Sequence, residues 1–193
     1  MLDHRPALAI PDRAATGDNV ALAVHQVPGI ALVIQGRAQR ALLVSRLAEI
    51  LGAPPPETPG AVGDPVEAVW SGPDRWLLVS PDRQGAPLPP AAAFAGTEAI
   101  RLDQSDGWLL CSLSGPAAIA TLRKGVLIDL APQVFGPGAA ALTALDGMAC
   151  CLWRPAQPAD GRFRLLLRCS FTSAFLRWFE VSAAEYGFGI RAG

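Results

Sequence analysis

The chain has 193 residues, a length that fits one compact domain, and its formal net charge at pH 7 is −1. Half of the residues (51%) are hydrophobic and only 17% are charged, which leaves apolar side chains for a large core and for surface that a partner would cover. Sixteen basic residues oppose 17 acidic ones without forming a basic run, and this balance argues against a nucleic-acid partner.

The N-terminal residues 1–19 predict a tail or an extended arm. They mix acidic and basic side chains with prolines and contain no apolar stretch typical of a secretory signal. The longest apolar runs, such as residues 30–34, fall far short of the ~20 residues that a membrane-spanning helix needs. We therefore expect a cytoplasmic protein that makes no membrane contact.

The following segment predicts two strands and a helix. Residues 20–27 and 30–35 are rich in aliphatic side chains and flank a Pro-Gly break, a pattern typical of strands. Residues 38–51 carry one apolar stripe at helical spacing, and Gly52 stands where a C-terminal cap belongs. Residues 53–63, with three successive prolines, predict an extended connector outside regular structure.

A tryptophan-bearing hairpin is predicted next. Residues 66–71 and 74–80 are apolar runs that flank Gly72 and Pro73, which favour a turn. After a proline-rich loop, residues 91–95 predict a short helix.

The second half of the chain repeats this order. Residues 98–104 and 108–114 predict a second hairpin around Asp106 and Gly107, since Asp-Gly is a strong hairpin dipeptide. A short helix is expected to open at Pro116, because proline at the first helical position loses only a donor that would have no partner there.

The C-terminal part predicts one more strand pair and a longer helix. Residues 129–147 read as an irregular link. Residues 148–153 and 162–169 predict strands, and residues 171–186 predict a helix with aromatic side chains at helical spacing, ended by Gly187.

The paired pattern predicts an α+β fold. Residues 20–193 are expected to form a single α+β domain of two similar βαββ-like halves, about 20–96 and 97–190. Helices should pack on one face of each antiparallel or mixed sheet.

Residues that could carry chemistry are few, and the sequence has no dinucleotide, phosphate-loop or nucleophile-elbow motif. His25 favours a structural role with one polar partner, because nothing in the sequence assigns it a nucleophile and an acid. Asp103 and Asp106 bracket Ser105 and favour local turn hydrogen bonds, with a small-ligand site as the alternative. Asp129 is expected to accept backbone N–H bonds in the link that follows. We therefore assign no catalytic, cofactor-binding or metal-binding residue.

The cysteines and arginines receive structural interpretations of a similar kind. None of the cysteines has metal-ligand spacing, and small buried thiols in a reducing compartment are the favoured reading. The cysteines are Cys111, Cys150, Cys151 and Cys169. Arg154, Arg168 and Arg177 are candidates for a protein interface, and solvated strand ends or internal ion pairs are the alternatives.

The sequence from about Gly63 to Gly187 resembles the sarcosine oxidase gamma subunit family. An ordered series of short motifs carries the resemblance, and the first 50 residues carry less of it. The motifs are WSGPDRWLL (70–78), DQSDG (103–107), LSGP (113–116), LRKG (122–125), IDL (128–130), Phe135, RCSF (168–171), Trp178 and AAEYG (183–187).

The resemblance implies a non-catalytic structural subunit of a four-subunit sarcosine oxidase. Such complexes oxidise sarcosine to glycine, form hydrogen peroxide and pass the one-carbon unit to tetrahydrofolate, giving methylene-tetrahydrofolate. It implies that FAD, FMN, NAD and tetrahydrofolate belong to partner subunits, that no cofactor is bound by this chain, and that the chain packs chiefly on the large alpha subunit. It also implies a fold similar to folate-binding aminomethyltransferase domains.

A free-standing folate-binding or aminomethyltransferase-like domain is the alternative, and it rests on fold analogy. A pocket with Asp103 or Asp129 facing a pterin would favour it. Related folate-domain proteins of the iron–sulfur maintenance type carry a K-G-C-Y-x-G-Q-E motif, whereas here Lys124 and Gly125 are followed by Val126. The missing cysteine and carboxylate argue against an independent thiol- or folate-dependent role.

Overall fold

The computed structural model describes residues 19–36, 38–157 and 160–192. The predicted N-terminal arm, apart from Asn19, lies outside the described residues. Eleven strands are described: β1 (Val20–Val24), β2 (Gly29–Ile34), β3 (Ala61–Val62), β4 (Glu67–Gly72), β5 (Arg75–Ser80), β6 (Ile100–Asp103), β7 (Trp108–Ser114), β8 (Ala140–Leu145), β9 (Met148–Trp153), β10 (Phe163–Arg168) and β11 (Phe188–Ala192). The α-helices are α1 (Arg40–Leu51), α2 (Ala118–Leu122) and α3 (Thr172–Ala183), and single 3₁₀ turns lie at Ala91–Phe94, Ser105–Gly107, Cys169–Phe171 and Ala184–Tyr186.

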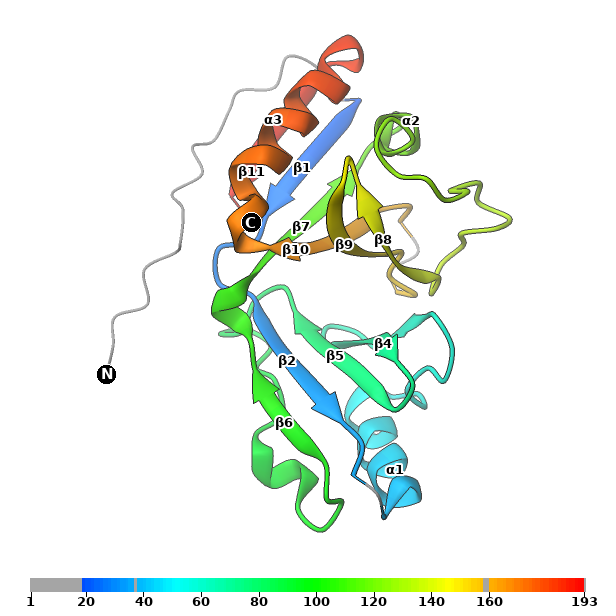
Figure 1. The fold of residues 1–193 in the computed structure, drawn as a ribbon, viewed down its shortest axis with the longest axis vertical. Coiled ribbons are helices and arrows are strands. Elements are labelled where there is room, and N and C mark those ends of the chain that lie inside the picture. The colour runs from blue at the N-terminus through cyan, green and yellow to red at the C-terminus, as the bar shows by residue number, and fades with distance from the viewer. Residues whose placement is uncertain (1–18, 37, 158–159, 193) are drawn as a thin grey trace.

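The strands form two sheets that stack face to face between outer helices, which confirms the predicted α+β class. The first sheet has the order β11-β1-β7-β10-β9-β8, and the second has the order β3-β4-β5-β2-β6. Helices α2 and α3 cover the outer face of the first sheet, while α1 covers the outer face of the second (Figure 1). The inner faces meet in a separate apolar cluster that includes Leu110, Leu166 and Val79.

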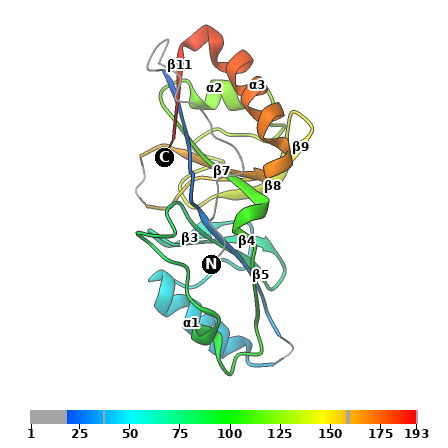
Figure 2. The ribbon, with the colours of Figure 1, turned by 90° about the vertical axis from the view of Figure 1, so that its left-hand side faces the viewer.

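The two sheets exchange strands across the middle of the chain. Strand β1 pairs with β7 and β11 in the first sheet, and the chain then enters the second sheet as β2. Strand β6 pairs with β2, after which the chain returns to the first sheet as β7. Figure 2, turned by 90°, shows the same two stacked parts joined by these crossings. The sheets therefore do not divide where the predicted halves 20–96 and 97–190 meet, and the two-half division stays a prediction.

The hairpin predicted around Asp106 and Gly107 is wrong, because the chain changes sheets at this turn. Residues 98–104 and 108–114 were expected to pair, but β6 and β7 lie in different sheets. Ser105 explains the change of sheet: the backbone N–H of Ile30 donates to its Oγ at 3.0 Å, and its own hydroxyl donates to Asp103 Oδ1 at 2.7 Å. These bonds fix the turn against β2, so the chain leaves toward the other sheet.

The other two predicted strand pairs are confirmed as antiparallel neighbours. In β4 and β5, Val69 lies opposite Leu77, with a bulge before Gly72. In β9 and β10, Leu152 lies opposite Leu165.

Three strands lie where none was predicted. Strand β8 lies within the predicted irregular link, and β3 within the predicted connector. Strand β11 follows the last helix and pairs in parallel with β1. Alanine-rich β8 has weak intrinsic strand propensity, and its pairing with β9 stabilises it instead.

Three of the predicted helices are present with shorter bounds, while the short helix predicted at residues 91–95 is a single 3₁₀ turn over Ala91–Phe94. Helix α1 runs from Arg40 to Leu51 and is capped by Gly52, whose φ of 72° is the left-handed conformation expected of glycine. Helix α3 buries Phe175 and Phe179 against the first sheet. None of the helices among the described residues has the length and apolar character needed to span a bilayer.

Candidate functional site

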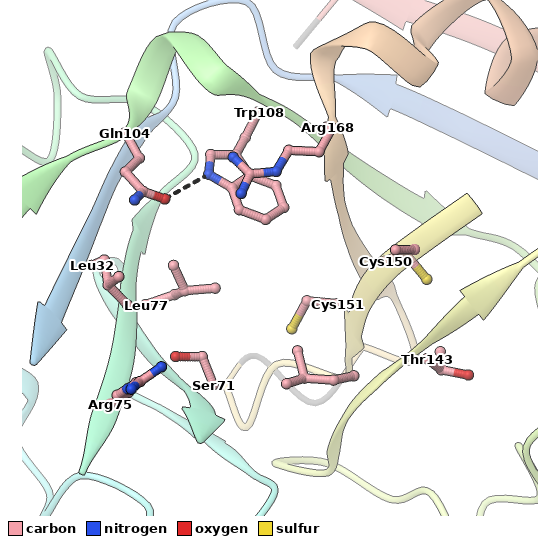
Figure 3. A pocket seen from close by; sticks show the side chains of 12 residues that line it. Leu32, Ser71, Arg75, Leu77, Gln104, Trp108, Thr143, Cys150, Cys151 and Arg168 are labelled. Carbon is pink, nitrogen blue, oxygen red and sulfur yellow. Dashed lines mark hydrogen bonds between the residues drawn. The ribbon is translucent and has the colours of Figure 1, made fainter. Parts of the chain in front are cut away.

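A cleft of about 620 Å³ opens between the inner faces of the two sheets. Its apolar walls come from Leu32 and Leu77 on the second sheet and from Leu142 and Cys151 on the first. Figure 3 shows Leu77 and Cys151 on opposite sides of the opening. Alternate side chains of a strand point to opposite faces of the sheet. The backbone of Cys150 therefore lies beside the cleft while its side chain points away from it.

Polar groups stand at both ends of this cleft. At one end the guanidinium carbon of Arg168 lies 3.9 Å from the centroid of the Trp108 ring, and Trp108 Nε1 donates to Gln104 Oε1 at 3.0 Å. At the other end lie Arg75 and Ser71 (Figure 3). The described lining thus combines an apolar floor with two cationic ends and contains no carboxylate. Such a lining suits apolar groups that carry negative charge.

Deeper in the interface, a buried ion pair joins the sheets. Arg164 on β10 bonds Glu67 on β4, and the indole Nε1 of Trp153 donates to Glu67 Oε2 at 3.2 Å. Glu67 is 2% exposed and Arg164 is 5% exposed. Burial raises the pKa of Glu67 to about 7, while the charge of Arg164 and the indole bond act in the opposite direction.

A second pocket of about 360 Å³ contains His25 and Ser112, which the sequence did not bring together. The imidazole Nε2 of His25 lies 2.8 Å from Ser112 Oγ, and a further hydrogen bond joins the ring to the carbonyl of Pro81. Burial, with the nearby guanidinium groups of Arg164, Arg162 and Arg191, lowers the pKa of His25 to about 4. The neutral ring thus donates to Pro81 and accepts from Ser112.

This pair has the composition of a nucleophile and its base, but its chemistry is that of a structural hydrogen bond. A general base works best when its pKa lies near the working pH, and a value of about 4 is too low for Ser112 activation. Asp160, the carboxylate that lines the same pocket, is held by Arg162. The sequence predicted a structural role for His25 with one polar partner, and the structure gives its ring two, Ser112 and the carbonyl of Pro81.

The cysteines behave as small apolar side chains. All four are free thiols, and Cys111, Cys150 and Cys151 are buried. Desolvation raises the pKa of Cys150 and of Cys151 to about 12 and that of Cys111 still further. These three thiols stay protonated near neutral pH, so they are poor nucleophiles and poor metal ligands.

Asp103 and Asp129 are engaged in local turns. Asp103 accepts from the backbone N–H and the hydroxyl of Ser105, which hold its pKa below the usual value despite partial burial. Asp129 Oδ1 accepts the backbone N–H of Ala131 at 2.9 Å, as the sequence predicted. Neither carboxylate is among the residues that line the two pockets described above.

The three arginines singled out from the sequence have different surroundings. Arg154 is half-buried, with its Nη1 donating to the carbonyl of Phe135 at 3.1 Å and its guanidinium 5.3 Å from the Phe163 ring. Arg168 lines the cleft, and Arg177 is exposed on α3. Only Arg168 is therefore placed at the cleft. Arg75 and Leu77 lie in the WSGPDRWLL motif, but the sequence did not place them or Leu32 at a shared cleft, because the packing of two sheets creates it.

The described residues offer no metal-ligand cluster, and the cleft lining offers no carboxylate to a pterin ring. Within the described part of the chain, no three His, Cys, Asp or Glu side chains gather as a metal site. A pterin ring presents amino and ring N–H donors, which a carboxylate would accept, whereas the described cleft lining offers two guanidinium groups. The geometry is suited to binding, and no described set of residues forms a catalytic constellation.

Comparison with known proteins gives no matching family model. Curated relatives are nevertheless similar over most of the chain. The sarcosine oxidase subunit gamma of Corynebacterium sp. (strain P-1) is 33% identical over 143 residues, which cover 72% of this chain and 69% of the relative. The subunit of the same name from Arthrobacter sp. is 32% identical over 143 residues, with the same coverage.

Solved structures agree with these relatives. A chain of the heterotetrameric sarcosine oxidase from Corynebacterium sp. U-96, in complex with pyrrole 2-carboxylate, is similar with a TM-score of 0.72 and 27% identity, and the match covers 89% of this chain and 87% of that one. The aminomethyltransferase T of the glycine cleavage system from Bartonella henselae matches with a TM-score of 0.60 and 15% identity, over 86% of this chain and 46% of that chain. The second likeness shows a shared fold alone, and this is the fold expected from the sequence.

Proposed function

Because the chain belongs to the family of sarcosine oxidase gamma subunits, we propose that it serves as a non-catalytic structural subunit of a four-subunit sarcosine oxidase. The observation that carries the proposal is the 33% identity over 143 residues, which spans 69% of the relative. The similarity to a chain of a heterotetrameric sarcosine oxidase supports it at the level of the whole fold. The partners are then the other sarcosine oxidase subunits, chiefly the large alpha subunit.

In this proposal the redox and one-carbon chemistry takes place on the partner subunits. These would bind FAD, FMN, NAD and tetrahydrofolate, oxidise sarcosine to glycine with formation of hydrogen peroxide, and produce methylene-tetrahydrofolate. The buried, protonated thiols and the locally bonded Asp103 and Asp129 support a structural role for this chain. The complex is proposed to work in the cytoplasm, a reducing compartment that suits the free thiols.

Coexpression with the other subunits of the same sarcosine oxidase tests this function. The tagged chain should retain all three partners through affinity and size-exclusion chromatography, and removal of the chain should lower the yield of the assembled complex. The rate of sarcosine oxidation per flavin should fall only in proportion to the loss of assembled complex. Separate elution of the chain from its partners would contradict the proposal.

The alternative of a free-standing folate-binding domain has weaker support. Its support is the aminomethyltransferase fold at 15% identity, and the two carboxylates that would have favoured it are bonded in local turns. Calorimetric titration of the isolated chain with tetrahydrofolate separates the two functions, since a subunit without a folate site gives no binding heat.

A further inference from the structure

We propose that the cleft between the two sheets is the docking site for an extended segment of a partner subunit that carries both apolar and carboxylate side chains. The inference rests on the proposed function, because it assigns the surface through which this chain would join its complex. It depends on the shape of the cleft, the apolar surface around it and the charge of its lining.

Apolar surface continues from the cleft onto the neighbouring edge strands. Within the described residues, six large apolar side chains are exposed, and three of them belong to the edge strands β6 and β8. Leu142 on β8 is 53% exposed and lines the cleft. Leu102 on β6 is 44% exposed and lies opposite Leu32, a cleft residue, on the same face of the sheet. A contiguous exposed apolar surface of this kind marks an interaction site.

Among the described residues, the charges in the cleft are of one sign and have no neutralising partner. Neither Arg75 nor Arg168 makes an ion pair with a carboxylate of the described chain. Arg168 lies against the Trp108 ring, which holds its planar guanidinium in place. Guanidinium groups beside an apolar floor attract carboxylates through charge-assisted hydrogen bonds, and because both arginines are exposed, solvent limits the strength of each pair.

The polar groups of the cleft also leave hydrogen-bonding capacity. The buried hydroxyl of Ser71 has no hydrogen-bond partner within the described residues. Arginine and tryptophan are enriched in the central parts of protein interfaces, whereas lysine, glutamate and aspartate are depleted. The described lining follows this composition in part, with two arginines, one tryptophan and no lysine, glutamate or aspartate, although Ser71 and Ala149, of types also depleted at interfaces, belong to it.

A polypeptide segment fits these features better than a small anion does. A small-molecule site usually buries most of its ligand, whereas here both arginines are exposed and the apolar surface extends past the cleft to Leu102. An extended segment covers the floor with apolar side chains and places carboxylates near the two cationic ends.

Charge reversal in the coexpressed complex tests the assignment. Arg75→Glu with Arg168→Glu, and separately Leu142→Asp, should weaken binding of the full chain to its partner subunits by about tenfold or more, measured by biolayer interferometry at fixed salt. Arg46→Glu on α1 and Val181→Asp on α3 are matched controls, because both residues are exposed on helices that cover the outer faces of the sheets. These controls should bind as the wild type does, and circular dichroism should report the same fold for every variant.

The possible outcomes separate this inference from the proposed function. If the wild-type chain fails to assemble, the proposed function fails and the docking site fails with it. If the complex forms and the cleft variants bind like the controls, the function stands and the docking assignment is overturned.

A photo-crosslinker identifies the occupant of the cleft. With p-benzoyl-L-phenylalanine in place of Leu142, mass spectrometry should find a crosslink to a carboxylate-bearing segment of a partner subunit. A crosslink to a second copy of this chain, or to its own residues 1–18, would overturn the proposal. Binding of 2-naphthoate that Arg168→Glu abolishes, with assembly unchanged, would assign the cleft to a small anionic ligand instead.

Discussion

Two ionisable side chains, buried Glu67 and half-buried His25, have pKa values displaced in opposite directions. Burial raises the pKa of Glu67 from 4.5 to about 7, so the folded chain holds more protons than the unfolded chain between those values. Burial and neighbouring arginines lower the pKa of His25 from 6.5 to about 4. Between pH 4 and 6.5, this group therefore binds fewer protons in the folded chain than in the unfolded chain. Each difference corresponds to about 3 kcal/mol of unfolding free energy.

The contributions of these groups to stability oppose one another over the same pH range. The contribution of Glu67 is fully present below pH 4.5 and is lost as pH rises through about 7. The contribution of His25 is fully present above pH 6.5 and is lost as pH falls through about 4. Between pH 4.5 and 6.5 the two effects largely cancel in the wild type.

Single substitutions should reveal each effect. In Glu67→Gln, the free energy of unfolding should rise with pH between 4.5 and 6.5, relative to the wild type, by up to about 1.4 kcal/mol per pH unit. In His25→Gln it should fall with pH over the same range, because the effect of Glu67 remains. Urea unfolding followed by tryptophan fluorescence at three pH values measures both slopes. Parallel pH profiles for the wild type and both variants would show that neither group titrates as described.

The packing of α2 against α3 explains the LRKG motif at residues 122–125. Lys124 Nζ donates to the carbonyl of Ser182 at 2.6 Å and also bonds Glu185. Gly125 allows the indole of Trp178 to lie against the backbone, since a Cβ built at Gly125 would be 2.8 Å from Trp178 Nε1. The motif therefore fastens the end of the short helix to the long one.

An added methyl group at this position should weaken the fold. Gly125→Ala is expected to lower the free energy of unfolding by about 1–3 kcal/mol, because the rigid indole must move. Gly107→Ala is the control, since its Cβ would meet nothing closer than Arg168 Nη1 at 3.7 Å. In a Trp178→Leu background the added cost of Gly125→Ala should largely disappear. An equal cost in both backgrounds, measured by urea unfolding, would place its origin elsewhere.

Local signals predicted the elements that depend on local chemistry. The hairpin of β4 and β5 has a Gly-Pro turn between two apolar runs, and α1 ends at a glycine, so both could be inferred from the sequence. The hairpin predicted from the Asp-Gly dipeptide at residues 106–107 was wrong, because a turn dipeptide does not specify the sheet that the next strand joins. That choice depends on Ser105 bonding to Ile30, a contact 75 residues apart in the chain.

The cleft could be predicted only in part for a related reason. Arg168 stood out as an arginine at a strand end, but its stacking on Trp108 depends on the pairing of β10 with β7. Leu77 and Cys151 come from different sheets and meet only when the inner faces pack. Sequence periodicity shows which side chains share a face of a strand, and it does not show which faces meet.

At the scale of the whole molecule, the strand exchange ties the two sheets into one unit. Strand β1 belongs to the N-terminal part of the chain, yet its buried Val20, Leu22 and Val24 complete the core beneath α3. Strand β6 belongs to the later part and completes the other sheet. The Glu67–Arg164 bond joins the inner faces between them. A single cooperative domain over residues 20–193 is therefore predicted.

Fragments divided between the predicted halves should test this unity. Residues 20–96 alone leave β1 without its pairing strands, and residues 97–193 alone leave β11 without β1, so neither fragment should unfold cooperatively in urea. Coexpression of the two fragments should restore the far-ultraviolet spectrum and a single transition. Residues 26–104, which contain every strand of the second sheet, should retain more ordered structure than residues 20–96. Cooperative folding of residues 20–96 alone would show that the sheets are independent, because the exchanged strands would then add nothing to the stability of either sheet.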